Sequence, residues 1–201
     1  DFVVTQIRAG RLEARIRDEK IPLGFDFVGQ ETTGIGGFTN ALRTIPQMEQ
    51  IAKAVEQNAP DAWLVNFSNP SGIVTEFLLN HTHLKAVGLC NLPIGTQERV
   101  SKLLELPMDQ VRLETVSLNH CGAVTALHVG GENVLPQLLD ARMLDHAAQQ
   151  DAWIQNYRPI IELIRAIPND YLQYFFYHGR KLTEQKAAPQ TRGEACVDIE
   201  T

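Results

Sequence analysis

The sequence AWLVNFSNPSG at residues 62–72 joins a short apolar run to a turn and to the beginning of a helix. Its first half has the apolar and aromatic composition of a buried strand, and Pro70 stands where a first helical turn tolerates proline. The same order returns at residues 86–106, where an apolar run is followed by Cys90 and by a helix that opens at Pro93. Two successive strand, turn and helix units predict a parallel sheet covered on both faces by helices.

The segments outside these two units extend the pattern. Residues 2–5 have the composition of a further buried strand, and apolar side chains at helical spacing predict a helix over residues 40–58. Later in the chain, the apolar runs at residues 111–118 and 123–129 predict an antiparallel hairpin, and residues 135–167 are expected to be mainly helical. The sequence thus predicts an α/β fold in which a parallel sheet is followed by a second layer.

Three other segments are less regular. Charged side chains interleave with few apolar ones over residues 7–20, which predicts a polar helix or a loop over a site. Four glycines within residues 29–37 allow close approach of the backbone to a ligand, although a plain flexible loop has the same composition and no GxGxxG fingerprint is present. The aromatic segment at residues 171–177 is expected to be core.

The composition excludes several classes of protein. The chain has 201 residues, a hydrophobic fraction of 44% and a net charge of -6, which suits a sizeable globular domain and argues against disorder. It has no block of Lys or Arg that would form a nucleic-acid surface, and no apolar run that would span a membrane or start a signal peptide. We therefore expect a cytoplasmic protein. Its three cysteines are expected to be reduced, because their odd number and irregular spacing do not suggest a disulfide framework.

Cys90 and His120 are the first candidates for a metal site. Each follows an apolar run that has the composition of a strand, so a thiolate and an imidazole would lie at the ends of strands. Asn69 follows another predicted strand and would lie on the same rim as Cys90. These residue types also have simpler explanations, because a small buried Cys and a hydrogen-bonded His are common in folded proteins.

Seven short runs of sequence resemble the NAD- and Mn-dependent glycosidases of glycoside hydrolase family 4, in the order and with the spacing of that family. They are TQIR (5–8), DEKIPL (18–23), GQET (29–32), NFSNP (66–70), GLCN (88–91), LNH (118–120) and YLQY (171–174). The resemblance implies that residues 1–108 are the C-terminal part of a Rossmann-like NAD-binding domain and that residues 109–201 begin an α+β catalytic domain. It also implies that the first strands and the Gly-rich NAD-binding turn are not in this chain, so no cofactor-binding residue is assigned.

The resemblance also implies roles for eight residues. Cys90 and His120 would hold a divalent metal, Mn2+ or another cation. Tyr171 would be the base that removes the sugar C2 proton, and Glu31 would be a second catalytic polar group. The residues that would contact substrate are Arg15, Asn69, Asn91 and Arg192, of which the guanidinium of Arg192 suits the 6-phosphate. From the residues alone, the alternative for Arg15 and Glu31 is a solvated face or a helix charge pair.

Asn91 decides which substrate is expected. In the family, the residue after the metal-binding cysteine tends to be Asp in 6-phospho-α-glucosidases, and here it is Asn, as in the 6-phospho-β-glucosidases. The resemblance therefore implies hydrolysis of 6-phospho-β-glucosides, either phosphorylated disaccharides or aryl glucosides, by NAD-dependent oxidation, elimination, addition and reduction. It also implies a homo-oligomer when the protein is complete, with this chain inactive by itself. The alternatives are a 6-phospho-α-glucosidase, another family 4 glycosidase, or a non-catalytic remnant without a nucleotide site.

Overall fold

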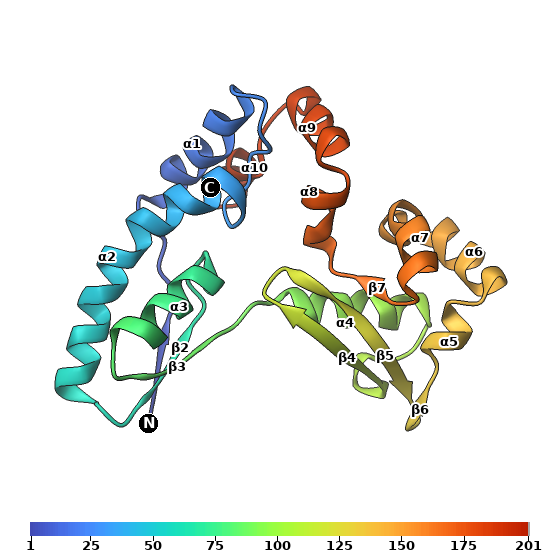
Figure 1. The fold of residues 1–201 in the computed structure, drawn as a ribbon, viewed down its shortest axis with the longest axis horizontal. Helices are drawn as coiled ribbons and strands as arrows, with labels where there is room; N and C mark the ends of the chain where they lie inside the picture. Colours follow the sequence, from blue (N-terminus) through green and yellow to red (C-terminus); the bar gives the residue numbers. More distant parts are fainter. Residues whose placement is uncertain (201) are drawn as a thin grey trace. The chain divides into compact units, whose positions relative to one another are not determined.

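A computed structural model gives the fold of the chain and describes residues 1–200 (Figure 1). The chain forms two compact units. Unit 1 contains Asp1–Cys90 together with the C-terminal segment that begins at Tyr177, and unit 2 contains Asn91–Phe176. This division differs from the expected boundary between residues 108 and 109, and the assignment of those domains to NAD binding and to catalysis stays a prediction.

The sheet of unit 1 is parallel and has the strand order β1-β2-β3. Its strands are β1 (Phe2–Thr5), β2 (Trp63–Asn66) and β3 (Lys85–Gly88), and the register places Leu64 beside both Val3 and Ala86. The helix α2 (Gly34–Asn58) precedes β2, and α3 (Ser71–His81) connects β2 to β3. This arrangement confirms the α/β fold that the two strand, turn and helix units predict.

The core of unit 1 lies between the sheet and these two helices. Met48, Ala52 and Val55 recur at helical spacing on α2, so one face of the helix is apolar. They pack against Leu64 of β2 and Leu78 of α3, and all five side chains are buried. Burial of this apolar stripe explains why the segment after the glycines forms a long helix.

The glycine-rich segment is not a ligand loop over its whole length, because α2 begins at Gly34 rather than near residue 40. A Cβ atom at Gly36 would lie 2.2 Å from the backbone oxygen of Gln30 and 2.5 Å from that of Asp18. The first turn of α2 therefore packs directly against the backbone of the preceding segments, and only glycine leaves room for that contact.

Three polar helices complete unit 1. They are α1 (Arg11–Leu23) and the C-terminal helices α9 (His178–Ala187) and α10 (Arg192–Glu200). Of the polar helix or loop expected over residues 7–20, the structure has the helix, which begins at Arg11 and ends at Leu23. The C-terminal helices contact the N-terminal part of the chain through polar groups. The side-chain amide of Gln185 bonds to both backbone groups of Gly29, and Lys20 pairs with Glu194. Figure 1 shows α10 beside α1.

Unit 2 is built on the predicted antiparallel hairpin. Strands β4 (Val111–Leu118) and β5 (Cys121–Val129) pair along their length, and the short strands β6 (Glu132–Asn133) and β7 (Ile167–Pro168) pair with β5. The helices of the unit are α4 (Leu92–Leu103), η1 (Met108–Gln110), α5 (Leu135–Leu138), α6 (Ala141–Gln150), α7 (Ala152–Ile164), η2 (Asp170–Leu172) and α8 (Gln173–Phe176). Asp151 caps α7 by accepting bonds from the amides of Trp153 and Ile154.

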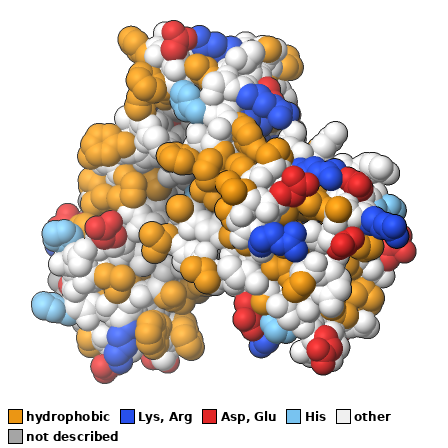
Figure 2. All heavy atoms as spheres, turned by 45° about the vertical axis from the view of Figure 1, so that its right-hand side comes forward, with side chains coloured by type: hydrophobic (Ala, Val, Ile, Leu, Met, Phe, Trp, Pro, Cys, Tyr) orange, Lys and Arg blue, Asp and Glu red, His pale blue; other side chains and the backbone are white. Residues whose placement is uncertain are grey.

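Several side chains that were expected to be buried are exposed. Phe2 on β1 is 75% exposed and Leu118 on β4 is 80% exposed, although both runs have the composition of buried strands. In the aromatic segment, Phe175 is 77% exposed, so the expectation of a core cluster is wrong there. The physical reason is that the described residues leave one face of the unit 1 sheet uncovered, and Trp63 on the central strand β2 is accordingly 46% exposed as well. The end of β4 is also uncovered, since Val116 is 71% exposed. Figure 2 shows apolar side chains at many places on the surface that it draws.

Within the described residues, no helix is both long and apolar enough to cross a membrane.

The packing of Gly36 gives a test of the fold. We expect Gly36→Ala to lower the free energy of unfolding by about 1–3 kcal/mol, because the new methyl group overlaps backbone atoms that cannot move aside cheaply. Gly179→Ala in α9 is the matched control, since a Cβ atom there meets no atom within 4 Å. That change should leave stability unchanged or raise it by up to about 1 kcal/mol. Urea unfolding measures both variants, and equal effects would contradict the close contact at Gly36.

Candidate active site

His120 and Tyr171 lie against each other in unit 2. Their ring centroids are 3.6 Å apart and the ring planes differ by 8°, which is a parallel stack. His120 comes from the turn between β4 and β5, and Tyr171 comes from η2, about fifty residues later in the chain. The structure thus brings together the predicted metal ligand and the predicted base.

The turn that carries His120 is tight. Leu118 and Cys121 pair as the last residues of the two strands, so Asn119 and His120 form a two-residue connection. His120 has a φ angle of 61°, in the left-handed region that favours glycine. A bulky residue in this region costs stability, and such positions are often retained for function.

Two hydrogen bonds hold Tyr171 next to that turn. The backbone amide of Asn169 donates to the carbonyl oxygen of Gly122 (2.8 Å), which fixes the segment to β5 two residues after His120. The side-chain oxygen of Asn169 accepts from the backbone amide of Tyr171 (2.9 Å). In addition, the hydroxyl of the buried Tyr157 donates to the carbonyl oxygen of Asp170 (2.9 Å). Asn169 and Tyr157 were not predicted from the sequence, because their partners are distant in the chain or are backbone atoms.

The imidazole of His120 is half-buried, and burial lowers its pKa below the usual value. A lower pKa keeps the ring neutral at physiological pH. The neutral ring is the form that coordinates a metal ion.

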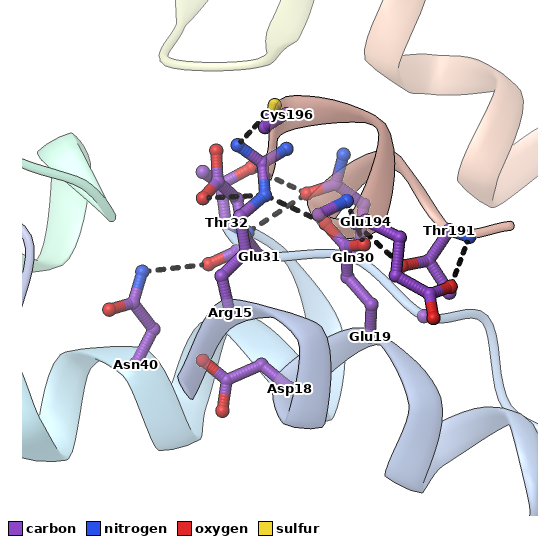
Figure 3. A network of polar contacts seen from close by, with 12 residues as sticks. Arg15, Asp18, Glu19, Gln30, Glu31, Thr32, Asn40, Thr191, Glu194 and Cys196 are labelled. Carbon is purple, nitrogen blue, oxygen red and sulfur yellow. Dashed lines mark hydrogen bonds and ion pairs between the residues drawn. The ribbon is translucent and has the colours of Figure 1, made fainter. Parts of the chain in front are cut away.

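A charged network occupies unit 1, and Figure 3 shows its members around Arg15. The Arg15 Nε atom lies 2.9 Å from Glu19 Oε1 and 3.3 Å from Glu31 Oε2, and its Nη1 lies 3.5 Å from Cys196 Sγ. Glu31 also pairs with Arg8 at 2.6 Å. The structure therefore places two predicted site residues, Arg15 and Glu31, in direct contact.

The electrostatics of this network keep Arg15 charged. Burial would lower the pKa of Arg15, but the hydrogen bond to Glu19 and the negative charges of Glu31 and Glu19 outweigh it, so the pKa is raised. Glu19 and Glu31 are both buried carboxylates. Arg15 balances charges that would otherwise be costly to remove from water. Glu19 was missed in the sequence, although its position four residues after Arg15 is typical of a helical ion pair.

The remaining predicted residues lie at the ends of elements. Arg192 is the first residue of α10 and is exposed, and within the described part of the chain no ion pair to it is present. Asn69 is half-buried after β2, and its carbonyl oxygen accepts a bond from Thr44 Oγ1 (3.4 Å). Cys90 is half-buried and ends unit 1, and the exposed Asn91 begins unit 2. Among the side chains of residues 1–199, no three His, Cys, Asp or Glu gather as a metal site, so a metal there would need further ligands.

The backbone at His120 gives a second prediction. His120→Gly and His120→Ala both remove the imidazole, but only glycine adopts the left-handed conformation without strain. We expect the Gly variant to be more stable than the Ala variant by about 1 kcal/mol in urea unfolding. An Ala variant that is equally stable would show that the turn is not strained.

Comparisons with known proteins bear on the family to which the chain belongs. The model of the family 4 glycosyl hydrolases matches residues 1–106. A probable 6-phospho-beta-glucosidase of Bacillus subtilis is 40% identical over 200 residues, which are 96% of this chain and 45% of that protein.

Two solved structures resemble the chain closely. The 6-phospho-beta glucosidase from Thermotoga maritima, solved with manganese, NAD+ and glucose-6-phosphate, has a TM-score of 0.83 at 32% identity over 99% of this chain and 48% of its own. A 6-phospho-alpha-glucosidase from gut microorganisms, solved with NAD and Mn2+, has a TM-score of 0.83 at 30% identity over 98% of this chain and 48% of its own. The chain spans less than half the length of these relatives. Because the family model matches more than half of the residues of this chain, the chain belongs to glycosyl hydrolase family 4.

Proposed function

We propose that the protein hydrolyses 6-phospho-β-glucosides with the help of NAD and a divalent metal ion. The observation that carries the proposal is the stack of Tyr171 on His120, which joins a phenol to an imidazole of metal-ligand type. The relatives support the substrate class, since several are named as 6-phospho-glucosidases and one structure contains glucose-6-phosphate. The proposed substrates are phosphorylated disaccharides or aryl glucosides.

The donor atoms suit a divalent metal. Cys90 and His120 would hold the ion through a thiolate and a neutral imidazole, and the lowered pKa of His120 favours the neutral ring. A thiolate is softer than the oxygen ligands that manganese prefers, so the choice of metal would depend on availability and on additional oxygen ligands. When bound, NAD+ accepts and returns a hydride and the metal polarises sugar oxygens.

The other predicted site residues would remove a proton from the substrate or bind it. Tyr171 would accept the proton from the sugar C2 atom, since a phenol can act as a base where its charged form is stabilised. Arg192 would bind the 6-phosphate, which a guanidinium fork matches with two parallel hydrogen bonds. Asn69 and Asn91 would hydrogen-bond sugar hydroxyls. This scheme needs no pair of catalytic carboxylates, unlike most glycosidases.

Arg15 and Glu31 have a narrower role in this proposal. Each is engaged by the other in the structure, and Arg15 is also paired with Glu19. Contacts of Arg15 with substrate and a catalytic role for Glu31 stay predictions from the family resemblance. In the structure they form an ion-pair network with Glu19, which also accepts a hydrogen bond from the amide of Gly193 in α10.

The second candidate is a 6-phospho-α-glucosidase. A phospho-alpha-glucosidase of Clostridium acetobutylicum is 31% identical over 98% of this chain, so overall similarity does not separate the two anomers. Asn91 favours the β-anomer, because an amide cannot give the proton transfer or the negative charge that an aspartate offers to an α-linked leaving group.

The assay of the whole protein separates these functions. We expect turnover of p-nitrophenyl 6-phospho-β-glucoside with NAD+ and Mn2+, little turnover of the α-anomer, and no turnover when NAD+ is removed. Turnover of the α-anomer alone would favour the second candidate. Turnover that persists without NAD+, or no turnover of either anomer, would overturn the proposal.

The role of Tyr171 gives a sharper prediction. Tyr171→Phe keeps the ring that stacks on His120 but removes the hydroxyl, so turnover should fall by about 10²–10⁴-fold while glucose 6-phosphate binding is retained. Tyr177→Phe, at the start of α9, is the matched control and should change turnover by less than about threefold. A Tyr171→Phe enzyme with full turnover would exclude the phenol as base.

A further inference from the structure

We propose that Glu19 is a positioning residue that fixes the N-terminal turn of α10, and with it Arg192, against α1. The inference rests on the proposed function, because it takes Arg192 as the group that binds the 6-phosphate. Glu19 is 3% exposed and uses both carboxylate oxygens. Its Oε1 atom accepts from Arg15 Nε (2.9 Å), and its Oε2 atom accepts from the backbone amide of Gly193 (2.6 Å), which lies 174 residues later in the chain.

The contact with Gly193 is suited to a negative charge. The first amides of a helix have no partner within the helix and form the positive end of its dipole, so a carboxylate there is stabilised. Gly193 is buried, and a Cβ atom at this position would lie 3.1 Å from Glu19 Oε2 and 3.1 Å from Ile16 Cγ1. Glycine therefore allows the helix end to approach Glu19 closely.

Other bonds in Figure 3 fix the same turn. The side chain of Glu194 accepts from the amide of Thr191 (2.9 Å), and the hydroxyl oxygen of Thr191 accepts from the amide of Glu194 (3.3 Å). This reciprocal pair is a capping box. Glu194 also pairs with Lys20 of α1. The backbone on both sides of Arg192 is therefore held in place.

Arg192 combines this fixed backbone with an available side chain. It is exposed, and the described residues make no ion pair with it, whereas the guanidinium of Arg15 is occupied by two carboxylates. A guanidinium on a fixed backbone loses less freedom on binding an anion than one on a mobile segment. Arg15 instead offsets the negative charge of Glu19, which would otherwise repel a 6-phosphate bound by Arg192.

Whether Glu19→Gln weakens or strengthens the binding of glucose 6-phosphate distinguishes a positioning role of Glu19 from a purely electrostatic one. Glu19→Gln removes a negative charge, so an electrostatic effect alone would strengthen binding of glucose 6-phosphate. If Glu19 positions Arg192, the same change should weaken glucose 6-phosphate binding by about tenfold, the loss of one well-placed charge-assisted contact. Binding of unphosphorylated glucose should not change. Gly193→Ala disturbs the same contact without altering any charge and should act in the same direction.

Calorimetric titration with glucose 6-phosphate and with glucose tests this on the whole protein, with Glu13→Gln as control because Glu13 is an exposed carboxylate of the same helix. Unchanged or tighter binding of glucose 6-phosphate by Glu19→Gln would overturn the inference. Equal weakening for both sugars would do the same, since it would indicate general loss of structure.

Hydrogen exchange of the Gly193 amide separates this inference from the proposed function. Exchange should be at least about tenfold faster in Glu19→Gln than in Glu13→Gln, because a buried amide loses its charged acceptor. An unchanged rate would overturn the contact itself. A wild-type protein that does not prefer glucose 6-phosphate over glucose would overturn the phosphate role of Arg192, and the exchange rates would then still decide whether Glu19 holds α10.

Discussion

A carboxylate that is almost wholly withdrawn from water is the constraint on which unit 1 depends. The carboxylate of Glu19 accepts hydrogen bonds from Arg15 and from the first turn of α10, and loss of Arg15 would leave a buried carboxylate without its ion-pair partner. Asp18, also buried, is met by Arg43 and by the hydroxyl of Thr39 in the same way. Charge pairing therefore contributes to where α1 meets α2 and α10, beside the buried apolar side chains of Leu12 and Ala14.

The proposed chemistry is divided between the two units. Unit 1 carries the exposed guanidinium that is proposed to bind phosphate, on a helix end that its polar network holds in place. Unit 2 carries the imidazole and the phenol, stacked at the end of a hairpin whose turn adopts an unfavourable backbone conformation at His120. In both units the side chain proposed to act lies at the first turn of a helix or in a tight turn, and neighbouring backbone bonds fix its position.

The regular parts of this fold follow from local sequence, and the exceptions follow from long-range contacts. Apolar runs and turns predicted β2, α3, β3 and α4 in order, and β4 at its observed bounds, because strands and helices differ in period. The burial of Phe2 was wrongly predicted, since local sequence does not show which face of a sheet other elements cover. Motifs assigned roles to His120 and Tyr171, but their stack depends on the bond between Gly122 and Asn169, which no local pattern predicts. The contact of Glu19 with Gly193 was missed for the same reason.

In the proposed reaction, Tyr171 removes the proton at C2 of the sugar before the glycosidic bond is cleaved. The most direct measurement is hydrolysis of a 6-phospho-β-glucoside by the whole protein in D2O, followed by NMR of the glucose 6-phosphate produced. Proton removal by Tyr171 predicts deuterium at C2, because the base exchanges its proton with solvent before the proton is returned. A product that retains only protium at C2 would exclude removal of the C2 proton and would indicate direct displacement at C1.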